Sequence, residues 1–395
     1  MQLHNHKLYP HQIGSFLRVG EFMATAGGVI AEPGALDSYF GWLEDGEEEC
    51  SGLEPFFYDE EAARAEHAAA QAAKEKLRKK EAREKERRDL RRKAHMAVKN
   101  QIRDYDKKQG GIYYSRFCFA DFSKFDINKE SSIGPMRYTN RVCKPGERPY
   151  ELCEAINILF VDIVCSDVGF PINVYGTVIA RDAIDLKCVY LFRRNRDDCE
   201  LINSKEESLT LTGPKRGLAL IDDAYVEFDL KIKGDGKHND KELSKGFVII
   251  DGIARRWLSG PVVESRSLAT RLSTVEVVYG VVKDAVEATI AIEVVHGDFY
   301  GAITACTTSI LDNIVLHDGI YTDTRIVTGA MQLLRSVVAV YLKESLFVTI
   351  IAQTDCGEHE KEIEFTPNMN GDDAKEVTVC GTTMLVKVVW SIIDL

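Results

Sequence analysis

From about residue 150 to Leu395, apolar and polar residues alternate over short runs, so the sequence has a period of two. The clearest run is YVEFDLKIK at 225–233, whose Val, Phe, Leu and Ile face one way and whose charged residues face the other. Because successive side chains of a strand point to opposite faces, this run predicts a strand with one face on a core. Turn residues separate it from thirteen further runs of the same kind: Ile156–Ser166, Ile172–Ala180, Cys188–Phe192, Ser208–Thr212, Gly246–Asp251, Thr274–Val282, Val286–His296, Ile303–Thr308, Ser336–Leu342, Leu346–Gln353, Lys361–Thr366, Glu376–Cys380 and Thr383–Ile393. Short strands at this spacing predict sandwiches or barrels.

The number of runs exceeds the seven to nine or so strands of one sandwich. Two matches in the same order indicate an internal duplication. The first pairs VDIV at 161–164 and YGTVIA at 175–180 with IEVV at 292–295 and YGAITA at 300–305. The second pairs Thr212-Gly213 and Arg216 with Thr328-Gly329 and Arg335. We therefore predict a mainly β fold with two tandem antiparallel β-sandwich-like units, 150–262 and 272–395, joined around Ser259–Pro261.

The first 104 residues have a different composition. Residues 1–58 show no sustained period, and between Glu44 and Glu61 there are nine Asp or Glu and no Lys or Arg. This predicts a disordered acidic tail. Residues 59–104 are rich in Ala, Glu, Lys, Arg and Leu and lack Gly and Pro, which predicts one long charged α-helix. It resembles a coiled coil only in charge, because Leu77 and Leu90 are too few to fill a heptad seam.

Charge is distributed unevenly along the chain. The formal net charge is −12, but Lys74–Lys93 holds twelve Lys or Arg against five Asp or Glu, a local +7, which leaves −19 for the rest. One interpretation is a solvated helical spacer. The other is a nuclear-import or RNA-contacting segment, centred on RRDLRRK at 87–93. Under the second interpretation, the candidate contact residues are Arg87, Arg88, Arg91, Arg92 and Lys93.

An aromatic-rich stretch joins the helix to the strands. After Gly110 and Gly111, six aromatic rings fall within Tyr113–Phe125. Each ring buries roughly 150–250 Å² when packed, so residues 105–149 are predicted to form an aromatic strap that ties the start of the β region to its core. A platform for nucleic-acid bases would need more interleaved cations than Arg116 and Lys124. We expect residues from about 105 onward to fold without the first hundred.

Several motifs resemble a plant family known as domain of unknown function 6598. They are QGGIYYSRFCFADFSKFD at 109–126, ESSIGPMRYT at 130–139, LTGP at 211–214, TVE at 274–276, AVEATI at 285–290, ACTTSI at 305–310 and FTP at 365–367. The resemblance covers Gln109 to the end. The family has no established activity, but some members are similar to the non-toxin part of jasmonate-induced ribosome-inactivating proteins. The resemblance therefore implies a stress or defence role.

No catalytic, cofactor-binding or metal-binding residues are predicted. None of the ten cysteines belongs to a Cys-x-x-Cys pair, so we expect free thiols, with those in apolar runs acting as small buried hydrophobes. His238 stands near Asp235 and Asp240, but Lys237 opposes a cation, which favours a surface loop over a calcium site. Glu61-Ala62-Ala63-Arg64 resembles the Glu-Ala-x-Arg helix of ribosome-inactivating N-glycosidases. The charged residues that follow it indicate a coincidence.

These observations favour a non-catalytic, intracellular plant interaction module whose partner is an unidentified protein. Two alternatives stay open: an rRNA N-glycosidase of the ribosome-inactivating kind or its accessory domain, and RNA or ribosome binding through the basic helix. No apolar run is long enough for a membrane span. The N-terminus lacks the apolar region of a secretory signal. We therefore expect the cytoplasm, with the nucleus as the alternative.

Overall fold

The computed structural model of the protein describes residues 59–135, 151–354 and 357–393. The predicted acidic tail and the last part of the predicted strap, 136–150, lie outside the described residues. The described part is mainly β, as predicted, with one long N-terminal helix and several antiparallel sheets. No helix among the described residues is long and apolar enough to cross a membrane.

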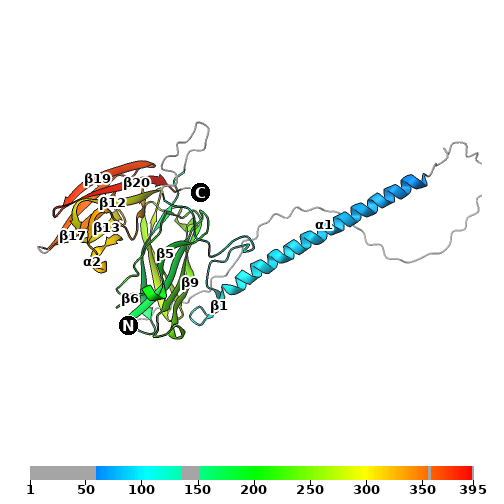
Figure 1. Cartoon of the computed structure of the whole chain (residues 1–395), viewed down its shortest axis with the longest axis horizontal. Coiled ribbons are helices and arrows are strands. Elements are labelled where there is room, and N and C mark those ends of the chain that lie inside the picture. Colours follow the sequence, from blue (N-terminus) through cyan, green and yellow to red (C-terminus); the bar gives the residue numbers. More distant parts are fainter. Residues whose placement is uncertain (1–58, 136–150, 355–356, 394–395) are drawn as a thin grey trace, which may run out of the picture. The chain divides into compact units, whose positions relative to one another are not determined.

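Sandwich 1 consists of two antiparallel sheets around one apolar core (Figure 1, green). The first sheet has the order β10-β11-β3-β7, formed by Val262–Thr270, Ser273–Val282, Ala155–Ser166 and Leu218–Ala219. The second has the order β5-β4-β8-β9, formed by Val189–Arg194, Ile172–Arg181, Asp223–Ile232 and Lys241–Asp251, and β6 (Glu200–Ile202) pairs with β4. In β8, Val226, Phe228 and Leu230 are buried, as the period of two predicts.

Sandwich 2 repeats this arrangement (Figure 1, yellow to red). Its first sheet has the order β19-β20-β12, with β15 and β16 on the other edge of β12; the strands are Gly371–Val379, Thr382–Ile392, Ala285–Phe299, Ile326–Ala330 and Val337–Tyr341. Its second sheet has the order β14-β13-β17-β18, formed by Ile314–Asp318, Gly301–Thr307, Leu346–Thr354 and Gly357–Phe365. The short helices are η1 (Arg196–Asp198), η2 (Lys237–Asn239), η3 (Ile253–Arg255) and α2 (Gly319–Thr322).

The two sandwiches share one strand order, so the prediction of two tandem sandwiches is confirmed. A pair of glycines supports the match at residue level. A Cβ at Gly176 in β4 would lie 2.0 Å from the carbonyl oxygen of Asp229 in β8, and one at Gly301 in β13 would lie 1.9 Å from that of Ile351 in β17. Both Tyr-Gly steps therefore let the neighbouring strand approach closely.

The sheets divide the chain later than the predicted joint at 259–261. Strand β11 pairs with β3 and β10 pairs with β11, and most of their buried apolar residues belong to the core of sandwich 1. The core of sandwich 2 takes most of its residues from Ala285 onward. We therefore propose the unit boundary at Lys283–Asp284 rather than between 262 and 272. The repeated motifs lie in the early strands of each unit. The alternation of residues in a later strand does not indicate which strands it pairs with, so the sequence did not locate this boundary.

Helix α1 spans Glu60–Gln101, close to the predicted 59–104, and none of its residues is buried. Asp59 caps it, because its Oδ1 accepts hydrogen bonds from the backbone N–H groups of Glu61 and Ala62 at 2.9 and 3.0 Å. A hairpin that the sequence pattern did not predict follows, with β1 at Arg103–Asp106 and β2 at Gly111–Tyr114. Its turn uses Gly110 at φ 75° and Gly111 at φ 141°.

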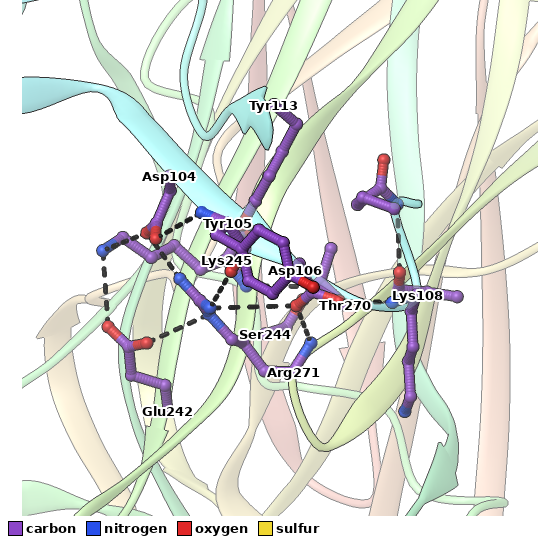
Figure 2. Close-up of polar contacts among 12 residues, drawn as sticks. Asp104, Tyr105, Asp106, Lys108, Tyr113, Glu242, Ser244, Lys245, Thr270 and Arg271 are labelled. Carbon is purple, nitrogen blue, oxygen red and sulfur yellow. Dashed lines mark hydrogen bonds and ion pairs between the residues drawn. The ribbon is translucent and has the colours of Figure 1, made fainter. Parts of the chain in front are cut away.

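Charged side chains fasten this hairpin to sandwich 1 (Figure 2). Figure 2 shows Arg271, in the turn after β10, between Asp104 of β1 and Glu242 of β9; the Arg271–Glu242 ion pair is 3.0 Å. Lys245 pairs with Asp104 at 3.1 Å, and the hydroxyl of Tyr113 donates to the carbonyl of Lys245 at 2.6 Å. The start of the strap is thus held by ion pairs as well as by rings.

Candidate functional site

The basic segment, Lys74–Lys93, lies entirely within α1 and is exposed along its length apart from half-buried Asp89. Among the described residues, Lys79, Arg91 and Arg92 are the cations of this segment with a carboxylate within 4.0 Å, namely Glu75, Asp121 and Asp89. The other nine of its twelve cations have no such partner there. The charge excess seen in the sequence is therefore mostly uncompensated in the fold.

Part of the basic segment meets the strap. Arg88, Arg91, Arg92 and His95 are three or four residues apart, so they share one side of the helix. With Asp121 of the strap they line a hollow of about 240 Å³. Arg91 donates to Asp121 at 2.6 Å, and hydrogen bonds from Ser123 and then Arg91 hold the pKa of Asp121 well below its usual range. Asp121 therefore stays ionised at neutral pH. It forms an ion pair with Arg91, one of the predicted contact residues.

Aromatic packing fixes this junction. The His95 and Phe122 rings stack with centroids 5.6 Å apart, and the backbone N–H of Phe122 donates to His95 Nδ1 at 3.2 Å. His95 is therefore held by both a ring contact and a backbone hydrogen bond that its Nδ1 accepts. Phe122 also belongs to a small buried cluster with Ile102 and Ile127, which is separate from the cores of the two sandwiches.

The strap is attached to sandwich 1 through one buried carboxylate. Glu227 of β8 accepts from Arg181 of β4 at 2.8 Å, from Arg116 of the strap at 2.9 Å and from the backbone N–H of Phe117 at 2.9 Å. Burial opposes the charge of Arg181, but the hydrogen bond with Glu227 prevails and raises the pKa of Arg181. Arg181 also donates to the carbonyl of Ile127 at 2.6 Å. Two cations and one backbone N–H thus satisfy a carboxylate that would be costly to bury alone.

The five predicted contact residues are all exposed, and they do not all line this hollow. Arg88, Arg91 and Arg92 line it, whereas Arg87 and Lys93 do not. Glu61 and Arg64, the N-glycosidase-like pair, are also exposed. Arg64 pairs with Glu60 at 2.9 Å, so the local sequence places this arginine in a surface i,i+4 pair.

Among the cysteines within the described residues, Cys118, Cys165, Cys188, Cys199, Cys306 and Cys380 are free thiols. The expectation that those in apolar runs are buried is wrong for Cys118, Cys165 and Cys380, which are exposed. In β3 the register shifts between Ile163 and Cys165, so the alternation that buries Val161 and Ile163 does not continue to Cys165. Among the described residues, no group of three or more His, Cys, Asp or Glu could hold a metal ion.

Sequence reasoning missed a cleft between the two sandwiches, with a volume of about 500 Å³. It is lined by β3 and the 194–211 segment of sandwich 1 and by residues 313–335 of sandwich 2. Arg335 forms part of its wall and is only 3% exposed. Its Nη2 donates to the carbonyl of Ile158 at 2.5 Å and its Nη1 contacts that of Leu159 at 3.5 Å. The repeat of a Thr-Gly pair followed by an arginine singled out Arg335. Nothing in the sequence indicates which residues surround it in the fold.

These features define a protein of two tandem antiparallel β-sandwiches with a basic helix and a cleft between the sandwiches. Within that class, a family model described as Domain of unknown function (DUF6598) matches residues 155–388, from β3 into β20, so the chain belongs to this family. The matched range begins after the strap and excludes the motifs at 109–126 and 130–139. No curated protein and no solved structure matches the chain.

Proposed function

We propose that the chain is a non-catalytic interaction module that holds an acidic partner through the basic segment. The observation that carries this proposal is the set of nine cations without a carboxylate partner among the described residues. Exposed charges of one sign attract a partner of the other sign and speed its encounter. We propose that the protein acts in the cytoplasm, with the nucleus as the alternative.

The chemistry of the segment favours the acidic surface of a protein over RNA. Glu81, Glu84, Glu86 and Asp89 are interspersed among the cations and would repel a continuous phosphate backbone. The carboxylates of a protein surface, unlike the phosphates of a continuous backbone, can be spaced so that they face the cations of the helix and avoid its acidic residues. RNA or ribosome binding through Arg87, Arg88, Arg91, Arg92 and Lys93 is the second candidate, supported by the hollow that Arg88, Arg91 and Arg92 line.

The test measures binding of poly-L-glutamate and of a single-stranded uridine oligonucleotide to the full chain at several salt concentrations. The informative variant carries Arg87→Glu, Arg88→Glu, Arg91→Glu and Arg92→Glu. The matched control reverses four exposed lysines of the sandwiches, Lys205, Lys215, Lys241 and Lys361, and has the same net charge. We expect the helix variant to lose binding to poly-L-glutamate and the control to keep it.

The two candidates give different results. If RNA is the partner, the logarithm of affinity should fall with the logarithm of salt with a slope of about −3 to −4, for five or so neutralised phosphates. If the control loses binding as completely as the helix variant, net charge rather than this segment is responsible and the proposal fails.

The resemblance to relatives of jasmonate-induced ribosome-inactivating proteins supports a plant stress or defence setting for this module. It also raises the N-glycosidase alternative, for which the exposed, surface-paired Arg64 gives no support. Incubation of the protein with ribosomes, followed by aniline treatment, tests that alternative directly. A released rRNA fragment that disappears in Glu61→Ala would replace the proposed function.

A further inference from the structure

We propose that the cleft between the two sandwiches binds a small organic monocarboxylate with an apolar body, and that Arg335 provides the cation for its carboxylate. This site is separate from the basic segment and does not depend on the function proposed for it. The proposal rests on three observations: an uncompensated buried arginine, carboxylates of the cleft that already have partners, and an apolar wall of suitable size.

Arg335 is a buried cation without a carboxylate partner among the described residues. Burial lowers the pKa of Arg335 to about 10, so the guanidinium is still charged at neutral pH. Its Nε has no hydrogen-bond partner there, and the 3.5 Å contact of Nη1 is at the long limit for a hydrogen bond. An uncompensated charge is expensive to bury, so an anion that reaches the Nη1 side would be bound strongly.

The repeat supplies an internal comparison. Arg216 stands two residues before β7, as Arg335 stands two residues before β16, and it is also buried. Arg216 makes a bidentate pair with Asp182, with Nη1 and Nη2 at 2.6 and 2.8 Å from its two oxygens. Asp182 directly follows β4, whereas Thr308 directly follows β13. Sandwich 2 thus keeps the arginine and lacks the acid.

The backbone holds Arg335 in place. The N–H of Leu334 donates to the carbonyl of Leu316 in β14 at 2.7 Å, and the carbonyl of Ser336 accepts from Ile290 in β12 at 2.7 Å. Both neighbours of Arg335 are therefore fixed to sandwich 2, while its guanidinium bonds to β3 of sandwich 1. A ligand would meet a cation whose position is set before binding.

Carboxylates also line the cleft, and each already has partners, although Oε2 of Glu200 has an ion-pair contact and no hydrogen bond among the described residues. Glu200 accepts from the N–H and hydroxyl of Thr210 at 2.9 and 2.6 Å and lies 3.8 Å from Arg194. Glu207 accepts from the N–H of Asn203 at 2.8 Å, and Asp318 caps α2 through the N–H of Tyr321 at 2.9 Å. These carboxylates would repel a dianion such as a phosphate ester more strongly than a monoanion, which is why we specify a monocarboxylate.

The walls of the cleft favour an apolar body. Leu159, Ile202, Leu209, Leu211, Val315 and Leu334 contribute aliphatic surface on both sandwiches. The volume of about 500 Å³ falls in the range of sites for small organic ligands, roughly 300–1,000 Å³, which are mostly apolar with a few polar groups that set orientation. A ligand with one carboxylate and an apolar body would pair with the charge of Arg335 and also pack against the apolar walls.

The test is calorimetric titration of the full chain with octanoate, phenylbutyrate and N-acetyl-L-phenylalanine, each beside its neutral primary amide. We expect at least one acid to bind, and to bind at least about tenfold more tightly than its amide, because a charge-assisted hydrogen bond is stronger than a neutral one. Arg335→Met should abolish this difference. Arg266→Met removes an exposed arginine that does not line the cleft, and should leave it intact.

Thermal melts separate loss of binding from loss of folding. We expect Arg335→Met to melt at or above the wild-type temperature, since a similar apolar side chain relieves an unpaired buried charge. Arg335→Lys should keep some preference for acids, because it retains the charge without the planar fork. If no acid binds better than its amide, or if Arg335→Met keeps the preference, the proposal is wrong.

Discussion

Asn157 in β3 exchanges two hydrogen bonds with the backbone of Ala339 in β16. Its Nδ2 donates to the carbonyl at 2.7 Å, and its Oδ1 accepts from the N–H at 2.8 Å. Glu287 in β12 makes the reciprocal contact, because its Oε2 accepts from the N–H of Gly217, next to β7. Each sandwich thus sends one polar side chain from its first strand to backbone of the other, in β16 or just before β7. The joint between the sandwiches therefore combines specific polar contacts with apolar packing, in which Ala155, Leu159 and Ala219 of sandwich 1 join the core of sandwich 2.

Asn157→Ala should destabilise the joint. The substitution leaves the buried N–H and carbonyl of Ala339 without partners, at about 1–3 kcal/mol for each unsatisfied group. We expect a clear fall in the melting temperature and a weaker preference of the cleft for acids. Asn173→Ala, at an exposed position of β4, is the matched control and should melt like the wild type. Equal melting of the two variants would contradict the role given to Asn157.

Gly301→Ala should be among the most damaging single-methyl changes in sandwich 2. A Cβ there would lie 1.9 Å from the carbonyl oxygen of Ile351, so β13 and β17 must move apart. We expect loss of several kcal/mol, the usual result when overpacking displaces backbone. Gly260→Ala adds the same atom where nothing lies within 4 Å and should change chemical-denaturation midpoints little. A mild effect at Gly301 would mean that the strands separate easily.

Acid should release the β1–β2 hairpin before the sandwiches unfold. Burial alone would raise the pKa of Asp104, but hydrogen bonds from Arg271, from the Tyr105 backbone and from Lys245 lower it to about 2. A carboxylate whose pKa is lower folded than unfolded stabilises the fold above its unfolded pKa, about 3.9. That stabilisation is lost as pH falls from about 4 towards 2.

Hydrogen exchange of the hairpin amides measures this release. Exchange should accelerate across that pH window in the wild type, while Asp104→Asn should show fast exchange already at neutral pH and no further change. Asp235→Asn, in an exposed loop, is the control and should follow the wild type. A wild-type profile that stays flat from pH 4 to pH 2 would exclude Asp104 as the anchor.

The C-terminal end of α1 packs against the strap and should therefore contribute to the stability of the β region. His95 and Ile102 pack against Phe122 or its cluster, so a chain that begins at Ala94 should retain the cluster and one that begins at Arg103 should lose it. Burial of one isoleucine contributes about 1.5–3 kcal/mol. We expect both chains to melt cooperatively with β-type circular dichroism, and the shorter one at a lower temperature. Identical melting would show that the strap needs no helix.

The sequence determined those features that depend on neighbouring residues. The period of two located the buried positions of β8, and the absence of Gly and Pro in a charged segment located α1 almost to its ends. The repeated Tyr-Gly step located equivalent strands, because the same close approach between strands requires glycine twice. Each of these follows from local geometry, which adjacent residues decide together.

The tertiary structure decided which distant residues become partners. The pairing of β11 with β3, and of β10 with β11, moved the proposed unit boundary. The strap placed Asp121 against Arg91, one of the five predicted contact residues. The sharpest case is Arg216 and Arg335, each of which follows a Thr-Gly pair and stands two residues before an equivalent strand. One meets Asp182, and the other meets backbone carbonyls across the joint. The electrostatic energy of a buried charge depends on what the fold brings within a few ångströms of it, and no local pattern carries that information.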